Sequence, residues 1–402
     1  MIKLLKILAN LNVILALVGY PFVTNVFADF MLSSSQIVTI PYRAFTLGVA
    51  LITILCSTLV NKQLKINKIV AVLFIYWILL FIRFEFDLQF RPELDLNLTR
   101  ANQIFLYMVG LAIVPMIAVV RTHKLLDFNK LLIWSYLISS ISLLLTFNNN
   151  DALQEASTER VWANIALNTI STGHLGLTNI ILGGVILLKH NLKLIYKGLI
   201  ILIGIIGFLT LLRAGSRGPV LALLLVVSFY IFSSSKYSFG GLILIIILIS
   251  GVYLFLDNII DWIGDISPIL KSRLFDRVDA TSDREPLYNE ALRVFYENPF
   301  IGRDFALYKY GSSFMYPHNL FLESLMQLGI VGCSLLVYIL YKTFKKGYQL
   351  IHTHSSSFWI VLLFVQEFSS LLVSGTFSMN PTFSILIILI ALSINSIKLK
   401  PI

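Results

Sequence analysis

The sequence predicts an all-α polytopic membrane protein, and three observations predict it. Hydrophobic residues make up 57% of the 402 residues and charged residues only 13%, whereas soluble proteins contain about 45–50% apolar and about 25% charged residues. The mean hydropathy is +0.84. Apolar stretches long enough to cross a bilayer recur along the chain, with lysine-rich segments at every second connection. This pattern excludes a soluble enzyme, a disordered chain and a secreted disulfide scaffold.

About twelve transmembrane helices are expected, because a spanning helix needs about 20 mostly apolar residues. Residues 1–256 would contain nine of them, residues 257–319 one large hydrophilic loop, and residues 320–402 the last three helices. No internal repeat divides the chain. The candidate spans run near residues 7–28, 39–60, 69–84, 101–120, 131–147, 172–188, 198–212, 219–233, 239–256, 320–341, 357–374 and 382–396.

Basic residues distinguish the two sides of this predicted bundle. The two ends and every second loop carry 17 basic residues, of which 16 are lysine, so this side and both termini are expected in the cytoplasm. The outer side, which includes the large loop, carries 14 basic residues, of which twelve are arginine. Arginine binds phosphate bidentately and stays charged when partly buried. The outer side therefore has the chemistry to bind an anion, although pairing with acids of the same loops is the alternative for each arginine.

Within the large loop, residues 282–286 predict the start of a short amphipathic helix. Ser282 and Glu285 stand at the spacing of a capping box, and a proline follows in the first turn. Apolar residues then recur at helical spacing for about three turns. This helix would present Arg284 near its N-terminus and Arg293 further along. It is either a structural lid over the bundle or a lid that carries an arginine to a phosphate.

The large loop ends with His318 and Asn319, directly before the span that begins at Leu320. Pro317 restricts the backbone before the histidine. With an unperturbed pKa of about 6.5, His318 can accept a proton from a hydroxyl group at neutral pH, and Asn319 supplies a second polar group. By the predicted topology, His174 is the other histidine on the outer side. A hydrogen-bonding residue at the membrane interface is the alternative for both histidines.

A tight outer turn between two spans, residues 213–219, contains two arginines and two glycines. Glycine lets backbone N–H groups approach an anion closely, and Arg213 and Arg217 would neutralise a diphosphate at the same depth. The alternative is that these arginines reach lipid headgroup phosphates from the membrane edge.

These motifs resemble those of the O-antigen ligase and polymerase superfamily, the bacterial glycosyltransferases of the Wzy and WaaL type. The sequence 216–218, Ser-Arg-Gly, lies in a short outer turn, and Arg284 opens a loop helix. The sequence 317–319, Pro-His-Asn, is followed after nine residues by Gly329 and Gly332. The motifs occur in the family's order and cover residues 200–340, about a third of the chain.

The resemblance implies a GT-C-like helical enzyme of the bacterial inner membrane that acts on the periplasmic side in lipopolysaccharide or polysaccharide biosynthesis. It implies an inverting, metal-independent transfer of a glycan linked to undecaprenyl diphosphate, without a cofactor. Arg217 and Arg284 would hold the diphosphate, and His318 would activate the acceptor. Its partners would be the lipid-linked oligosaccharide, the lipid bilayer and a chain-length regulator protein, and no nucleic acid is expected. Further substrate-binding candidates are Asn319, Arg160, Arg213, His174 and Arg293.

Polymerase and ligase share these motifs, and they differ in whether the acceptor is another lipid-linked repeat or lipid A-core; the polymerase is our first prediction. Two further alternatives remain. Acid pairs in the first outer loop, Glu85 with Asp87 and Glu93 with Asp95, are of the kind that holds a divalent ion. Arginines interleave with them, so a self-paired loop is the simpler interpretation. A flippase for lipid-linked sugars is the other alternative, but that class favours inverted repeats and charges along a central cavity.

Overall fold

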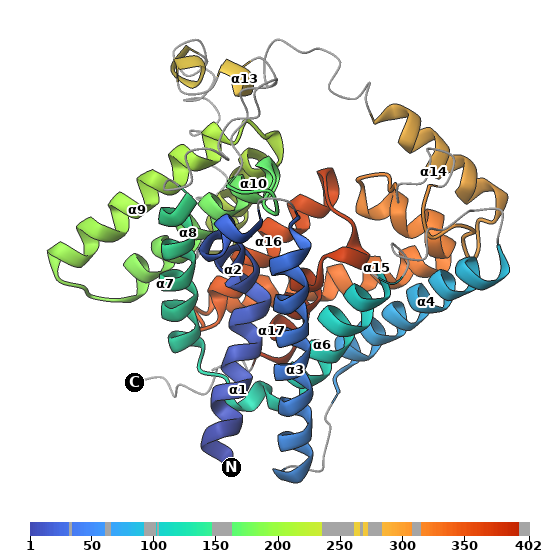
Figure 1. The fold of residues 1–402 in the computed structure, drawn as a ribbon, viewed down its shortest axis with the longest axis horizontal. Helices are drawn as coiled ribbons and strands as arrows, with labels where there is room; N and C mark the ends of the chain where they lie inside the picture. The colour runs from blue at the N-terminus through green and yellow to red at the C-terminus, as the bar shows by residue number, and fades with distance from the viewer. Residues whose placement is uncertain are drawn as a thin grey trace.

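The structure is a computed structural model that describes residues 1–31, 34–60, 66–91, 102, 104–146, 163–234, 261–265, 268–271, 284–307 and 315–393. The described residues form helices without a β-strand, and one isolated bridge joins Asn164 and Leu167. Figure 1 shows the arrangement of these helices. They are α1 (Ile2–Ile14), η1 (Leu15–Gly19), α2 (Tyr20–Val26), η2 (Ala28–Met31), α3 (Gln36–Val60), α4 (Lys68–Phe90), η4 (Tyr107–Ile113), α6 (Val114–Thr122), η5 (His123–Leu125), α7 (Phe128–Thr146), α8 (Thr169–Lys189), α9 (Leu194–Arg213), α10 (Arg217–Ser234), α13 (Pro268–Lys271), α14 (Glu285–Glu297), α15 (Leu320–His352), α16 (Phe358–Val373), η8 (Phe377–Met379) and α17 (Pro381–Leu392).

The predicted polytopic membrane protein is confirmed. Among the described residues, nine helices are long and apolar enough to cross a membrane. Two more predicted spans, near 357–374 and 382–396, form the shorter apolar helices α16 and α17. The predicted span at 239–256 lies outside the described residues. The number of twelve therefore stays a prediction, while eleven of the predicted segments fold as apolar helices.

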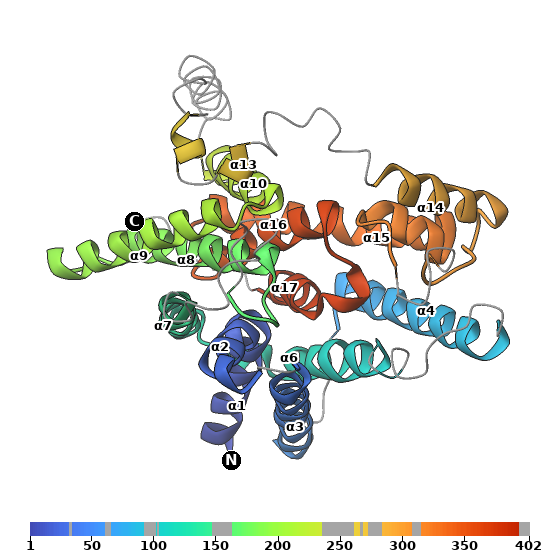
Figure 2. The same cartoon turned by 45° about the horizontal axis from the view of Figure 1, so that its top comes forward.

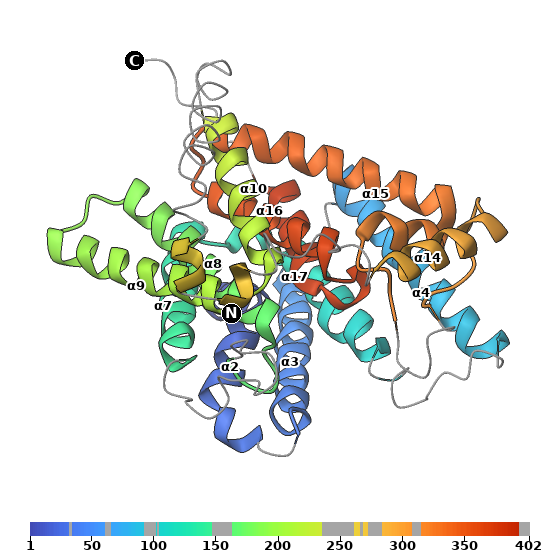
Figure 3. The ribbon, with the colours of Figure 1, turned by 90° about the horizontal axis from the view of Figure 1, so that it is seen from above.

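Two apolar helices that are shorter than the nine candidate spans among the described residues, α16 and α17, lie at the centre of the bundle. They have 16 and 12 residues, so α17 is only about 18 Å long, shorter than the hydrocarbon core of about 30 Å. Figure 3 shows both helices surrounded by the others, and the side chains from Phe383 to Ile390 are all buried. A helix that is apolar on every face is stable where protein surrounds it. One polar contact crosses this core, where Trp77 Nε1 donates to Ser384 Oγ at 3.0 Å.

The longest helix, α15, bends sharply at Gly329, which has φ 63° and ψ −159°. At the bend, backbone N–H groups lose their partners inside the helix. They donate instead to carbonyl oxygens of the loop that follows α14. Ile330 N–H donates to Pro299 O at 2.8 Å, and Val331 N–H donates to Phe300 O at 3.2 Å. The kink is thus a junction at which another segment completes the hydrogen bonds that the helix lacks.

The loop and the kink approach each other so closely that glycine is required on both sides. A Cβ on Gly302 would lie 2.4 Å from Gln327 C, and a Cβ on Gly329 would lie 2.4 Å from Phe300 C. Real Cβ atoms do not approach backbone atoms this closely. The second glycine of the motif, Gly332, faces the same problem, since its Cβ would lie 2.1 Å from Leu328 Cβ. The glycines of the sequence motif therefore build this kink.

The predicted amphipathic helix in the large loop is confirmed as α14. Its buried residues Leu287, Ala291 and Val294 pack against Met326 of α15, and Figure 2 shows α14 lying along the first half of α15. The predicted start was wrong by two residues. The helix begins at Glu285 with Arg284 as its N-cap residue, whereas the capping box predicted Ser282 as the N-cap; Ser282 lies outside the described residues.

We predict that Gly329→Ala destabilises the protein. The φ/ψ values of Gly329 are in a region that is essentially restricted to glycine, which costs other residues about 1–3 kcal/mol, and the new methyl group would collide with the backbone at Phe300. Thermal unfolding of the purified protein in detergent measures the loss. Gly198→Ala is the matched control, because a Cβ on Gly198 meets nothing within 4 Å. Equal melting temperatures for the two variants would contradict this account of the kink.

Candidate active site

Three segments that are far apart in the sequence meet at the C-terminal end of α16. Arg284 Nη1 donates to the carbonyl oxygen of Val373, and Nδ1 of His318 lies 3.0 Å from the carbonyl oxygen of Ser374. A Cβ on Gly218, next to Arg217, would lie 3.5 Å from Val373 Cγ2 and 3.9 Å from Ser374 Oγ. The structure therefore brings together the outer turn, the start of the loop helix and the histidine that closes the loop.

The hydrogen bond to Ser374 determines which nitrogen of His318 is available for chemistry. A carbonyl oxygen can only accept, so Nδ1 carries the hydrogen and donates it. In the neutral ring Nε2 then has the lone pair. The backbone of His318 has φ 52°, a left-handed conformation that costs a non-glycine residue roughly 1–2 kcal/mol. Its ring lies 4.4 Å from the ring of Tyr316. A side chain held in this way is oriented before any substrate binds.

The surroundings of His318 keep its ring neutral. Burial lowers the pKa of His318 below its ordinary value of 6.5, the hydrogen bond to Ser374 raises it, and the positive charge of Arg284 lowers it. The direction that results is downward. At neutral pH the imidazole is therefore in the form that can accept a proton.

The residues at the N-termini of two helices, α10 and α14, contact the C-terminal end of α16. Arg217 is the first residue of α10, and Arg284 is the N-cap residue of α14. Their side chains are partly buried. The first backbone N–H groups of a helix have no partner inside it and carry partial positive charge, which favours an anion. The turn before α10 depends on Gly215, whose φ is 60°. Guanidinium groups and helix ends together give this site a positive potential.

A buried carboxylate holds the loop that follows α16. Glu323 is 1% exposed and accepts hydrogen bonds from the Thr376 hydroxyl group and, at 3.1 Å, from Phe377 N–H. Gln327 Nε2 also donates to it, at 3.3 Å. Because Thr376 follows Ser374 by two residues, Glu323 fixes the loop whose carbonyl group orients His318. The sequence analysis did not assign it a role, although an acid inside a span is itself a signal of function.

The other predicted substrate-binding residues have different surroundings. Asn319 caps α15, since its Oδ1 accepts from the N–H groups of Phe321 and Leu322, each at 3.1 Å. Arg213 is exposed at the end of α9. Arg160 lies outside the described residues.

Arg293 lies on an exposed face of α14, nine residues and thus about 13 Å along the helix from Arg284. It forms ion pairs with Glu290 and Glu297 of its own helix, and the hydrogen bond to Glu290 raises the pKa of Arg293. The structure therefore does not place Arg293 beside His318. His174 is also separate from that ring, and it lines a cavity against α16.

The acid pairs of the first outer loop do not form a metal site in the part of the chain that the structure describes. Asp87 is fully buried, lies 3.6 Å from Arg83 Nη1 and accepts from Phe305 N–H at 2.7 Å. Glu85 instead accepts from Gln89, while Glu93 and Asp95 lie outside the described residues. No group of three or more possible metal ligands occurs among the described residues. Asp87 thus attaches α4 to the large loop.

Several arginines of the predicted outer side bind acids or backbone carbonyl groups of the protein itself, which was the alternative to binding an anion. Arg91 pairs with Asp304, and Arg303 pairs with Glu297. Arg83 donates to backbone carbonyl groups of residues 301–303 and 327, next to the Gly329 kink. These arginines stabilise the loop, whereas Arg284 and Arg217 lie at the end of α16.

Comparison with known proteins supports the same family as the motifs. Residues 202–337 match the family model described as O-antigen ligase, and this stretch contains Arg217, Arg284, His318 and the kink glycines. No curated protein and no solved structure matches the chain. The match supports a membrane enzyme of the O-antigen ligase/polymerase type acting on lipid-linked glycans, and it gives no support to a flippase. The resemblance to the O-antigen ligase/polymerase superfamily is confirmed for residues 202–337, about a third of the chain.

Proposed function

We propose that the chain is a surface polysaccharide polymerase, an inverting and metal-independent glycosyltransferase that joins undecaprenyl-diphosphate-linked oligosaccharide repeats. The observation that carries the proposal is the meeting of Arg284, His318 and the Arg217 turn at the end of α16. A neutral imidazole beside the Arg284 guanidinium group, with the Arg217 turn at the same helix end, suits an uncharged nucleophile and a strongly anionic leaving group.

In the proposed reaction, Nε2 of His318 accepts the proton of an acceptor hydroxyl group. The hydroxyl oxygen forms a bond with the anomeric carbon of the donor sugar while the bond from that carbon to the diphosphate oxygen breaks, with inversion. Arg217, Arg284 and the N-termini of α10 and α14 stabilise the negative charge that develops on the departing diphosphate. The imidazolium then releases its proton to water. Because diphosphate is already a good leaving group, charge neutralisation and one base suffice.

The proposal places this reaction on the periplasmic side of the bacterial inner membrane, with both termini in the cytoplasm. It rests on the lysine-rich connections, which mark the cytoplasmic side. The N-termini of α10 and α15 and the C-terminus of α16 all belong to the opposite side in that scheme. Their contacts with one another are consistent with it. A chain-length regulator remains part of the proposal as a partner.

An O-antigen ligase is the second candidate, because the matching family model carries that description. Both enzymes use the same donor and the same base. They differ in the acceptor, which is another lipid-linked repeat for the polymerase and lipid A-core for the ligase.

Deletion of the gene distinguishes these candidates. For a polymerase we expect lipopolysaccharide that carries a single repeat unit on its core. A ligase mutant would instead show bare core and accumulated lipid-linked polymer. Gel electrophoresis of lipopolysaccharide reads out the pattern. An unchanged ladder of chain lengths would contradict both assignments.

His318→Ala and Arg217→Ala should each abolish glycan assembly in cells. In purified protein we expect rates at least about 100-fold lower, because each removes a group that acts on the transition state. The assay contains EDTA, so it also tests metal independence. His123→Ala and Arg121→Ala are matched controls near the predicted cytoplasmic end of the bundle, where they contact Val120 and Ser57. Full activity of the two site variants at normal protein abundance would contradict the assignment.

The rate should depend on pH through His318. Its pKa lies below 6.5, so the ring is neutral above that pKa, and activity should fall only as the pH drops through it, with a midpoint below 6.5. Arg284→Gln removes a charge that lowers this pKa and should move the midpoint of the residual rate to higher pH. Arg284→Lys keeps the charge and should leave it in place. Identical midpoints for Arg284→Gln and Arg284→Lys would contradict the electrostatic effect of Arg284 on the pKa of His318.

A further inference from the structure

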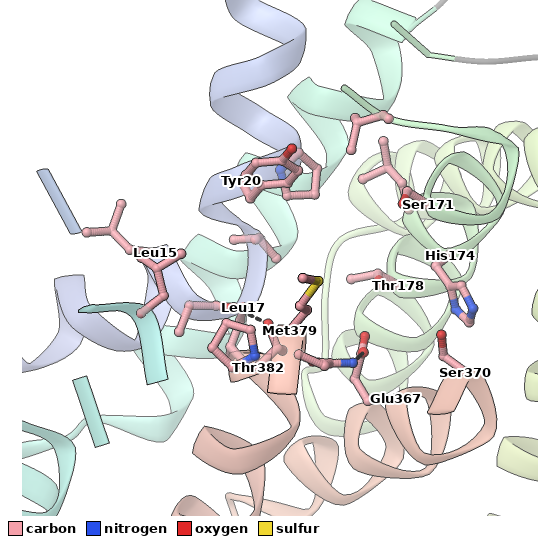
Figure 4. A pocket seen from close by; sticks show the side chains of 18 of the residues that line it. Leu15, Leu17, Tyr20, Ser171, His174, Thr178, Glu367, Ser370, Met379 and Thr382 are labelled. Atoms are coloured by element: carbon pink, nitrogen blue, oxygen red, sulfur yellow. Dashed lines mark hydrogen bonds between the residues drawn. The ribbon is translucent and has the colours of Figure 1, made fainter. Parts of the chain in front are cut away.

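A cavity of about 390 Å³ lies one helical turn from the proposed catalytic site. It is lined by α7, α8, α16, α17 and the parts of the first, second and fourth spans that contain η1, α3 and η4. Ser370 of α16 lines it, and Ser374 follows four residues later, about 6 Å along the helix. Figure 4 shows Ser370 and Glu367 on one side of this space, with His174 next to Ser370 and with Tyr20 and Leu17 on the opposite side.

His174 is the least satisfied polar side chain of this cavity. Both of its ring nitrogens are buried, and neither has a hydrogen-bond partner among the described residues. Since these nitrogens have no surface toward the cavity, His174 lines it with its other atoms, and the accessible polar groups on α16 are Glu367 and Ser370. The backbone at His174 is well fixed, since its carbonyl group accepts from Gln366 Nε2 at 3.3 Å. A Cβ on Gly173 would lie 2.6 Å from Pro219 Cγ, so this part of α8 rests directly on the Arg217 turn.

The charge of the cavity excludes a second diphosphate site. Its lining contains one carboxylate, Glu367, whose Oε2 accepts from Asn380 Nδ2 at 2.7 Å, and no lysine or arginine among the described residues. A polyanion would be repelled there. An uncharged ligand with several hydroxyl groups fits, because the Glu367 carboxylate accepts hydrogen bonds and the Ser370 hydroxyl group both donates and accepts them.

The backbone around the cavity is also unusual. Two π-helical segments, η1 and η4, interrupt otherwise α-helical spans, and both contribute lining residues, among them Leu15 and Tyr107. Such wide turns are rare and often occur at functional sites. Tyr20 and Tyr107 add aromatic rings, which offer flat apolar faces beside the polar groups.

We propose that this cavity binds the acceptor saccharide, as an uncharged sugar whose hydroxyl groups hydrogen-bond to Glu367 and Ser370 while its C–H face packs on Tyr20 and Tyr107. The inference rests on the proposed glycosyl transfer and deepens it. The diphosphate binds among the arginines at the end of α16, and the acceptor binds one turn along the same helix. This helix thereby sets the distance between the attacking hydroxyl group and His318.

Equilibrium binding tests the cavity without requiring turnover. The probe is the oligosaccharide repeat released by mild acid from the lipid-linked pool of the same cells, titrated calorimetrically into the full-length protein in lipid nanodiscs. Ser370→Ala removes the hydroxyl group, and Glu367→Gln keeps the acceptor for Asn380 but removes the charge. We expect each to weaken binding at least ten-fold. Asp261→Asn, an exposed acid paired with Lys271, and His123→Phe are controls that should bind normally.

Kinetics with varied acceptor and varied donor provide the second readout. Both cavity variants should raise the KM for acceptor and leave the KM for donor unchanged. The proposal is overturned by absence of binding to the wild type, by equal binding to all variants, or by displacement of the saccharide by inorganic pyrophosphate. If the wild type binds the saccharide but forms no glycosidic bond, the proposed function fails and the cavity remains a saccharide site.

Discussion

Two adjacent backbone carbonyl groups at the end of α16 organise the candidate active site. Val373 O accepts from Arg284, and Ser374 O lies 3.0 Å from Nδ1 of His318. The last carbonyl groups of a helix have no partner inside it, and here side chains from the large loop complete them. The same contacts fix the tautomer of the histidine and bring a guanidinium group to it. This helix end, together with Asp87 and the Gly329 kink, places the loop against the bundle.

Two other features keep that arrangement rigid. Glu323 holds Thr376 and Phe377 and so fixes the loop beyond Ser374. At the Gly329 kink, N–H groups of α15 donate to carbonyl groups of the loop after α14. These bonds position α14, whose N-cap residue is Arg284. A buried carboxylate and a glycine junction therefore act on the site without belonging to it. Because α16 and α17 are buried at the centre of the bundle, the helix end that binds Arg284 and His318 is itself held in place.

Much of the fold was predictable because hydropathy and lysine content are properties of single segments. The apolar helices, the amphipathic α14 and the meeting motifs follow from such local patterns. The role of α16 was not predictable, because backbone carbonyl groups at Val373 and Ser374 leave no signature in residue type. The local pattern also predicted the start of α14 at the wrong residue. It could not show that Asp87 pairs with Arg83 and accepts a hydrogen bond from Phe305. Nor could it show that His174 lines a cavity, since that cavity is formed by seven separate spans.

The most direct measurement is an experimental structure of the protein with a polyprenyl-diphosphate-linked glycan bound. The account predicts both phosphorus atoms between Arg217 and Arg284 at the end of α16, with Nε2 of His318 turned toward the anomeric carbon. A diphosphate bound at any other place, or a His318 ring that points away from it, would contradict the account.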